Sequence, residues 1–292
     1  MPSIYSPKIP MDTSVVVILC TCITTASLGQ EVYGVVSDSK THEPLAYVHI
    51  GVTGKNMGVI SRDNGSFKID LSKAERTDSL VFSIIGYETQ SYLASNVRGP
   101  IDVRMAPIVY RSEEFVVFRD TRPPKPEKKL GRHTPTKTAE PHSGIEEFGF
   151  GGEIGVKISP EGGKYFVNDA RFHMQGNTVD SILFRINLYF VDENDMPAEC
   201  ILQREIFTTA RKKMQWIVAE LRDENIVMEE DLIVTYEVVR VWFNKRDENQ
   251  MFFSSGEGYE EGGIYFRPSS QAAWTTDASR GPAAMYLTLE EY

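Results

Sequence analysis

The chain has few cysteines and no excess of positive charge. Only three of its 292 residues are Cys, and two of them fall within the first thirty residues. Cys200 alone is left beyond them, so we expect no disulfide within the folded domains and a buried, unreactive thiol at Cys200. The 41 acidic residues outnumber the 31 Lys and Arg residues, and the net charge of −10 argues against a nucleic-acid partner.

The sequence also lacks the spacings that catalytic and metal sites require. A zinc peptidase needs closely spaced His and Glu ligands plus a distant His, but no H-x-x-E or H-E-x-x-H run occurs among the five scattered His. No serine is flanked by the glycines of a nucleophile elbow. The glycines of residues 148–158 precede no helix that would bind a phosphate. We therefore predict no catalytic residues, no metal site, no cofactor and no enzymatic activity.

The first thirty residues are typical of an export signal. Lys8 supplies a weak positive region, and residues 15–23 form an apolar run that is too short to span a bilayer. Small residues then lead to Gln30, the expected mature start, and Met11 is an alternative initiation site. A lipoprotein signal is the other interpretation, but neither cysteine of the segment follows a residue that suits lipidation. We predict an exported protein of the periplasm, the outer membrane or the cell surface.

Residues 31–107 carry the clearest strand pattern in the chain. Short runs of Val, Ile, Tyr and Phe alternate with clusters of Asp, Asn, Gly, Ser and Pro, which predicts about seven strands in two small sheets. Asp63-Asn64-Gly65 is the strongest hairpin signal, because Asn-Gly accepts the positive φ angles of a two-residue turn. Beyond this turn, Phe67 and Ile69 are predicted to share the buried face of a strand.

The order of residues in this stretch resembles that of a known family. From Gly34 to Pro107 it reads G-V-V-x-D … T-x-E-P-L-x-x-V-x-I … S-x-x-x-G-x-F-x-I … D-x-L-x-F-S-x-x-G-Y … V-x-M-x-P. This pattern resembles the carboxypeptidase-regulatory-like domain common in exported proteins of the Bacteroidetes. The resemblance implies a transthyretin-like, seven-stranded Greek-key sandwich over residues 31–107. It supplies no catalytic residues, because the family is a structural module and fold alone does not give function.

The chain changes character after residue 107. Residues 114–117 resemble the short strand that follows such a module in TonB-dependent outer-membrane receptors, but the 175 residues that remain are too few for a large transmembrane transport barrel. Residues 119–143 are rich in Pro, Lys, Arg and Thr, with Leu130 almost the only aliphatic side chain. This composition predicts an extended linker, either a solvated spacer or a basic contact to anionic envelope material. We assign residues 108–143 to a strand plus this linker.

Residues 144–292 are predicted to form a second β-sandwich. Nine or ten runs have strand character, and the clearest covers residues 181–191. One face of this run carries Ile182, Phe184, Ile186, Leu188 and Phe190, and the other carries Leu183, Arg185, Asn187 and Tyr189. The alternation predicts one buried face and one half-covered face. We expect a jelly-roll-like sandwich, so that the whole chain is all-β.

Aromatic residues of the C-terminal third are the remaining candidates for ligand binding. Tyr259, Tyr265 and Trp274 lie with Arg267 in or near Gly- and Ser-rich loops. Such rings stack on sugars while Arg bonds to hydroxyls, although they equally serve to close the ends of a core. The acidic residues 192–195 suggest a calcium site, which a solvated turn explains as well. We predict a structural, adhesion or assembly role with an envelope protein or glycan as partner, and carbohydrate binding as the alternative.

Overall fold

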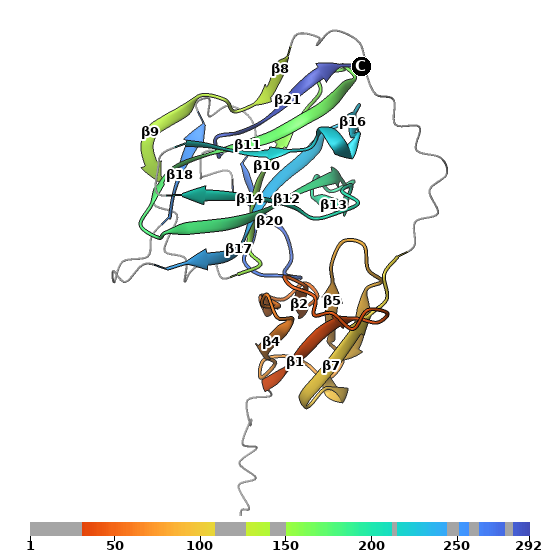
Figure 1. Cartoon of the computed structure of the whole chain (residues 1–292). Helices are drawn as coiled ribbons and strands as arrows, with labels where there is room; N and C mark the ends of the chain where they lie inside the picture. Colours follow the sequence, from red (N-terminus) through yellow and green to blue (C-terminus); the bar gives the residue numbers. More distant parts are fainter. Residues whose placement is uncertain are drawn as a thin grey trace, which may run out of the picture.

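The computed structural model describes residues 31–108, 127–140, 150–211, 215–243, 251–256, 263–277 and 283–292. These residues form two β-sandwich domains (Figure 1), and their only helical segments are two 3-10 turns, η1 (Ala94–Asn96) and η2 (Arg222–Glu224). Within the described residues, no helix is long and apolar enough to cross a bilayer. The predicted all-β class is confirmed. The predicted export signal, the receptor-like residues 114–117 and Tyr259 lie outside the described residues.

The first domain packs a three-stranded sheet against a four-stranded sheet. The first sheet has the order β4 (Ser66–Asp70), β1 (Glu31–Asp38), β7 (Gly99–Met105), and the second has the order β3 (Gly58–Ile60), β2 (His49–Val52), β5 (Ser79–Ser83), β6 (Gln90–Leu93). β1 and β7 run parallel, and the other pairs of these two sheets are antiparallel. The seven strands predicted for residues 31–107 are therefore present.

The alternation of apolar residues sets the core of this domain. Phe67 and Ile69 of β4 are buried between the two sheets, as predicted, together with Leu80 and Phe82 of β5. The rings of Phe67 and Phe82 meet edge-on, with centroids 5.3 Å apart. Successive side chains of a strand point to opposite faces, so each strand supplies the core with every second residue.

The Asp63-Asn64-Gly65 turn connects the two sheets and does not close a hairpin. The N–H of Gly65, at a φ of 72°, donates to the C=O of Arg62 at 2.8 Å, so the turn is tight. However, β3 before it pairs with β2, whereas β4 after it pairs with β1. The predicted two-residue hairpin is therefore wrong, because both flanking strands have partners elsewhere and only Gly65 of the turn takes a positive φ.

The second domain stacks two seven-stranded sheets. One sheet has the order β13 (Pro197–Cys200), β12 (Ser181–Val191), β17 (Leu232–Trp242), β10 (Glu153–Ile158), β19 (Ile264–Arg267), β20 (Thr275–Asp277), with β14 (Ile206–Arg211) also on β12. The other has the order β8 (Lys128–Gly131), β21 (Met285–Glu291), β11 (Tyr165–Asn177), β18 (Met251–Gly256), β9 (Pro135–Glu140), with β15 (Gln215–Glu220) and β16 (Val227–Met228) also on β11. The described part of this domain thus has more strands than the nine or ten predicted, because several are short.

Part of the predicted linker belongs to this second domain. β8 pairs with β21 and β9 pairs with β18, so residues 128–131 and 135–140 are strands of one sheet. Leu130 is only 6% exposed and lies in the core between the sheets. The linker prediction fails here because pairing at a sheet edge uses backbone N–H and C=O groups, which a polar composition does not reveal.

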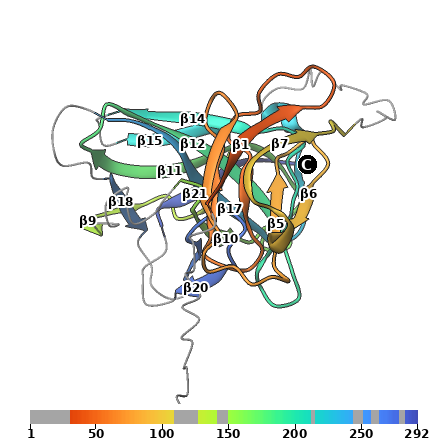
Figure 2. The same cartoon turned by 90° about the horizontal axis from the view of Figure 1, so that it is seen from below.

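The first domain lies against the outer face of the sheet that contains β12. Figure 1 shows the red-to-yellow first domain below the larger green-to-blue domain, and Figure 2 shows the same contact from below. Four side chains of β12, Ile182 to Leu188 at every second position, are buried between the sheets as predicted, but the fifth, Phe190 near the end of the strand, is 40% exposed, so the prediction is wrong there. On the opposite face Arg185 is only 1% exposed and Asn187 is also buried. The face predicted to be half-covered is therefore covered by the first domain at Arg185 and by Tyr265 and Trp274 of its own domain at Tyr189.

Replacing Leu130 by Ala tests whether β8 is a strand or a linker. The buried side chain predicts a loss of about 2 kcal/mol or more in the free energy of unfolding, because a cavity is left in the core. Thr134→Ala, at an exposed position of the same segment, should stay within about 0.5 kcal/mol of the parent protein. Urea unfolding measures both. Equal stability of the two variants would restore the linker interpretation.

Candidate functional site

Charged side chains meet in the contact between the two domains. His49 comes from β2 of the first domain, and the others come from the second domain at the outward positions of its strands or in the segment before β14. The strand pleat places Arg185 and Glu237 on the outer face of the sheet, because the residues on either side of each point into the core. We call this set the interdomain cluster; it consists of His49, Glu153, Arg185, Glu205, Glu237 and Arg267.

Glu237 binds partners from both domains. The Nε2 atom of His49 lies 2.9 Å from each carboxylate oxygen of Glu237, and Nε of Arg185 lies 3.0 Å from Oε2. Burial alone would raise the pKa of Glu237, but the charge of Arg185 and the hydrogen bond from His49 outweigh it and hold this pKa below its usual range. Burial lowers the pKa of His49. A neutral imidazole therefore donates its Nε2 proton to an ionised carboxylate.

Arg185 extends the contact to two further groups. One Nη atom donates to Glu205 at 2.5 Å, and the other donates to the backbone C=O of Tyr47 in the first domain at 2.7 Å. Tyr47 has a φ of 58°, a left-handed conformation that costs a bulky residue roughly 1–3 kcal/mol. Its ring packs edge-on against Phe207, with centroids 5.6 Å apart. The bond to Arg185 and the ring contact hold Tyr47 in this conformation.

Glu153 is neutralised by a second arginine. Arg267 contacts one carboxylate oxygen, and the hydroxyls of Thr235 and Tyr189 donate to the other at 2.5 and 3.1 Å. The indole of Trp274 lies beside this pair, with its centroid 4.9 Å from the guanidinium carbon of Arg267. A buried carboxylate with three donors is satisfied without water.

A metal ion does not suit this cluster. His49, Glu153 and Glu237 place one ligand atom each within 4.8 Å of one another, a spacing at which a cation could bind. Both carboxylates already accept hydrogen bonds from arginines, however, and two guanidinium charges repel a cation. A hydrolytic metal site also needs a position open to water, whereas both glutamates are completely buried. We interpret the cluster as an ionic contact that holds the domains together.

Glycines of the first domain let a loop of the second approach closely. A Cβ atom on Gly51 or Gly58 would lie 2.4 or 1.9 Å from the carbonyl oxygen of Ser270, so only glycine fits at either position. The next residue, Gln271, accepts a hydrogen bond from the N–H of Gly54 at 2.8 Å and donates its side-chain amide to Ser83 at 2.7 Å. Backbone contacts therefore support the charged ones.

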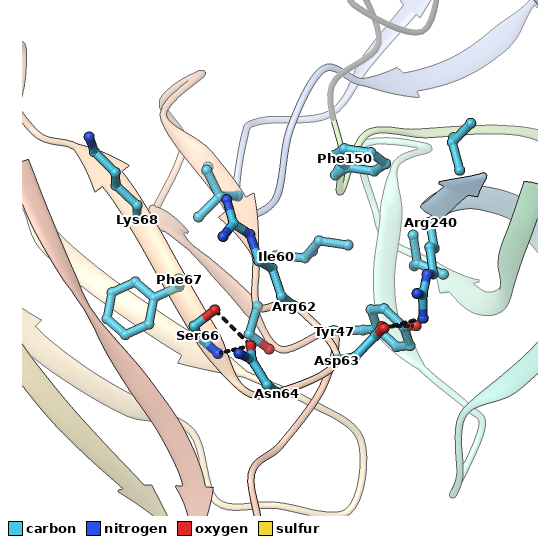
Figure 3. A pocket seen from close by; sticks show the side chains of 15 residues that line it. Tyr47, Ile60, Arg62, Asp63, Asn64, Ser66, Phe67, Lys68, Phe150 and Arg240 are labelled. Atoms are coloured by element: carbon cyan, nitrogen blue, oxygen red, sulfur yellow. Dashed lines mark hydrogen bonds and ion pairs between the residues drawn. The ribbon is translucent and has the colours of Figure 1, made fainter. Parts of the chain in front are cut away.

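An open cleft of about 720 Å³ lies beside this contact. The first domain lines it with β3, the following turn and the start of β4, and the second domain lines it with Phe150 and residues 239–241. Figure 3 shows Asp63 pointing across the junction to the guanidinium of Arg240. Asp63 also accepts a hydrogen bond from the Tyr47 hydroxyl at 2.5 Å. The turn residue Asp63 thus links the two domains, a role that the sequence did not indicate.

The structure brings three of the four predicted sugar-binding residues together inside the second domain. Tyr265 is only 4% exposed and its hydroxyl donates to Asp195 at 3.0 Å. Trp274 packs edge-on against Tyr189, with centroids 5.7 Å apart, and Arg267 is held by Glu153. These contacts match the alternative role of closing a core. Tyr259 lies outside the described residues.

Two weaker candidates make ordinary structural contacts. In the acidic turn, Asp192 accepts hydrogen bonds from the backbone N–H groups of Asn194 and Met196, each at 2.8 Å, and Asp195 pairs with Lys157. These bonds are typical of a turn that an Asp side chain stabilises. Burial raises the pKa of the Cys200 thiol to about 11, which keeps it in the unreactive thiol form at neutral pH.

The sequence contained only a partial signal for the interdomain cluster. Its members are far apart in the chain and form no local motif. Each of three apolar strands nevertheless carries a charge: Glu153 in EIGVKI, Arg185 in ILFRINLYF and Glu237 in LIVTYEVVRVW. A charge in such a strand is either exposed or paired inside the protein. The strand pattern alone does not show which, because the partners lie on other strands and in another domain.

Replacing Glu237 by Gln leaves the buried Arg185 with Glu205 as its remaining carboxylate partner. Because removing one partner of a buried ion pair is costly, we expect a loss of about 3–5 kcal/mol in the free energy of unfolding. The matched control is Glu161→Gln, at an exposed pair with Lys128, which should cost less than about 1 kcal/mol. Urea unfolding at neutral pH compares the two. A Glu237→Gln protein as stable as the control would contradict the role of the cluster.

Glu205 makes the stability depend on pH. Burial raises its pKa from 4.5 to about 7, against the opposing charge of Arg185, and nearby Glu237 adds to the rise. The folded protein therefore binds this proton more tightly than the unfolded chain, so Glu205 lowers stability as the pH rises from about 4.5 to 7. Glu205→Gln removes this effect. We expect its unfolding free energy, relative to the parent, to increase between pH 4.5 and 7; a constant difference would contradict the assignment.

Comparison with known proteins identifies the first domain. No curated protein matches the chain. The family model of the CarboxypepD_reg-like domain matches residues 32–117, which include nearly all of the first sandwich and the segment directly after it. The N-terminal sandwich of this chain is therefore a CarboxypepD_reg-like domain, as the sequence pattern had indicated.

Proposed function

We propose that the chain is an exported, non-enzymatic cell-envelope protein whose two β-sandwich domains act as one unit in attachment or assembly. The signal-like residues 1–30 support export. The observation that carries the proposed role is the interdomain cluster. Its His, Glu and Arg side chains are the residue types that perform acid–base or metal chemistry elsewhere, but here they bind one another in a closed contact.

A fixed arrangement of the two domains suits a protein that holds other molecules. Domains within one chain usually move relative to each other unless their interface is extensive. Separation of the two domains would expose the buried Glu237 and Arg185 to water and remove the contact of Glu237 with His49, because Glu237 takes partners from both domains. The pair of Asp63 with Arg240 and the bond from Gly54 to Gln271 add contacts at other points of the junction. Force applied to one domain would be transmitted to the other.

Carbohydrate binding is the second candidate, and a different aromatic residue favours it. Trp216 on β15 is half-buried and packs edge-on against Tyr286 and His173, with centroids 4.8 and 4.9 Å away. Arg171 lies over Tyr286 and makes two hydrogen bonds to Asp169 at 2.7 and 2.9 Å. A partly exposed ring beside fixed polar groups on a sheet face is a surface on which a sugar can stack.

Fractionation of cells that express the full chain tests the main proposal. We expect the protein in the periplasmic or membrane-associated fraction, with a mature N-terminus at or near Gln30, because the apolar run directs export. A chain that lacks residues 1–30 should stay in the cytoplasm. Crosslinking before purification should recover an envelope protein or glycan with the exported form. An intact N-terminus in the cytoplasmic fraction would refute the export part of the proposal.

A glycan array tests the second candidate. If it is correct, Trp216→Ala should abolish the signal of the parent protein, because the stacking surface is lost. Tyr265→Leu is a comparison variant at a ring that is only 4% exposed, and at a temperature where it remains folded it should keep the signal. A parent protein that binds no glycan on the array would remove this candidate.

A further inference from the structure

The cleft between the domains is bounded by the edges of two sheets. β3 is an edge strand of the four-stranded sheet and β4 is an edge strand of the three-stranded sheet. Both line the cleft, β3 with residues 58–60 and β4 with residues 66–68. An edge strand has a row of backbone N–H and C=O groups without a strand partner, and such a row can pair with an extended segment of another chain.

The pairing of β4 with β1 shows which of its backbone groups are turned outward. The N–H of Val36 donates to the C=O of Gly65 at 2.9 Å, and in an antiparallel ladder the bonded pairs recur at every second residue. Gly34 and Phe67 are therefore a bonded pair, whereas Tyr33 and Lys68 are not. The N–H and C=O of Ser66 and Lys68 consequently point away from β1. Those of Ser66 are already bonded, to Asn64 Oδ1 at 3.1 Å and to the N–H of Arg62 at 2.8 Å, so the open pair that faces the cleft belongs to Lys68.

One positive charge of the cleft has no partner among the described residues. Lys68 pairs with Glu31 at 2.8 Å and Arg240 pairs with Asp63. Arg62 is exposed, and none of the acidic side chains in the described part of the chain forms a salt bridge with it. Figure 3 shows Arg62 among the side chains that line the cleft, with no interaction drawn to it. A carboxylate is the complementary group for a guanidinium in this position.

An apolar surface lies in the same cleft. Phe150 of the second domain is 40% exposed there, and Val239 and Val241 of β17 complete this wall. The volume of about 720 Å³ is in the range of roughly 300–1,000 Å³ that is usual for ligand sites. The cleft thus combines an open strand edge, an unpaired cation and an apolar wall. An extended peptide that alternates acidic and apolar side chains matches all three features.

We propose that this cleft binds an extended acidic segment of a partner protein, which adds as a strand to the edge of β4. One of its carboxylates binds Arg62, and an apolar side chain packs against Phe150. The inference deepens the assembly role proposed above by naming the surface and the chemistry of the partner. It rests on that role, but peptide binding in solution does not depend on export.

The test uses the full chain and a fluorescent hexapeptide of alternating Glu and Val, with binding followed by fluorescence anisotropy. We expect saturable binding that weakens as salt is added. A peptide with Lys in place of Glu should not bind, because Arg62 repels it. A peptide that is N-methylated at every residue should not bind either, since it lacks the N–H groups that pair with a strand edge. Binding of the N-methylated peptide equal to that of the parent peptide would overturn strand addition.

Two charge-reversal variants locate the site. Arg62→Glu should weaken binding of the Glu-Val peptide about tenfold or more, because a charge-assisted hydrogen bond is replaced by repulsion. Arg104→Glu is the matched control: its position is exposed on β7, the opposite edge of the same sheet, and its affinity should equal that of the parent protein. Both substitutions are at the surface, and thermal unfolding checks that both variants fold.

Three further results would overturn the inference: no binding of the Glu-Val peptide, equal binding by the parent and Arg62→Glu, or binding of a galacturonic acid trisaccharide in place of the peptide. The last result would assign the cleft to an acidic glycan. Failure of peptide binding together with a correctly exported protein would remove this inference and leave the proposed function standing. Protein that stays in the cytoplasm but binds the peptide would contradict the proposed function and leave this inference standing.

Discussion

The ion pair between Glu237 and Arg185, joined by His49 from the other domain, is the interaction on which the arrangement of this protein depends. Glu237 is completely buried and Arg185 is 1% exposed, so neither charge can find a substitute partner in water. Such a group is costly if unpaired and weakly stabilising if paired, and it therefore selects one arrangement more strongly than it adds stability. Both charges belong to the second domain. The docked first domain covers this pair and gives it two further partners, the Nε2 atom of His49 and the backbone C=O of Tyr47.

This constraint explains the composition of the strands beneath the contact. β17 reads LIVTYEVVRVW and is buried on both faces over most of its length. Leu232, Val234 and Tyr236 point into the core of the second domain, and Thr235 and Glu237 point into the contact with the first domain. The strand therefore resembles one from a sheet covered on both sides, in which alternation between polar and apolar residues is lost. Its outer face is covered by the first domain at Glu237 and by Tyr189 and Tyr265 of its own domain at Ile233, in place of helices.

The sequence was sufficient for features that arise from local periodicity. The seven strands of the first domain and the burial of Phe67 and Ile69 follow from period-two alternation and turn residues, and the range 181–191 was identical to β12. It was insufficient where a long-range partner decides the outcome. The Asp63-Asn64-Gly65 turn formed, but its strands joined different sheets. The sequence predicted a linker over residues 128–140, because strands that form through backbone pairing at sheet edges leave little trace in the composition. Among the side chains described there, Leu130 enters the core.

The candidate sites depend even more on such long-range contacts. A charge at Arg185 or Glu237 was visible in the sequence, but its partner lies on another strand or in another domain. Tyr265 and Trp274 were predicted as binding residues because they are aromatic and lie near loops. Only the three-dimensional structure shows that their rings pack against neighbours. Exposure is a property of the assembled fold, so ring type and loop position cannot supply it.

Hydrogen exchange at the amide of Gly54 tests the fixed docking of the two domains most directly. Gly54 is exposed in a turn of the first domain, and its N–H is bonded at 2.8 Å to the carbonyl oxygen of Gln271 in the second. If the domains stay together, this amide exchanges only when the protein unfolds, with the same protection as the core strands. Exchange at the rate of an unprotected turn amide, while β2 and β17 stay protected, would mean that the domains separate in solution and would contradict the account.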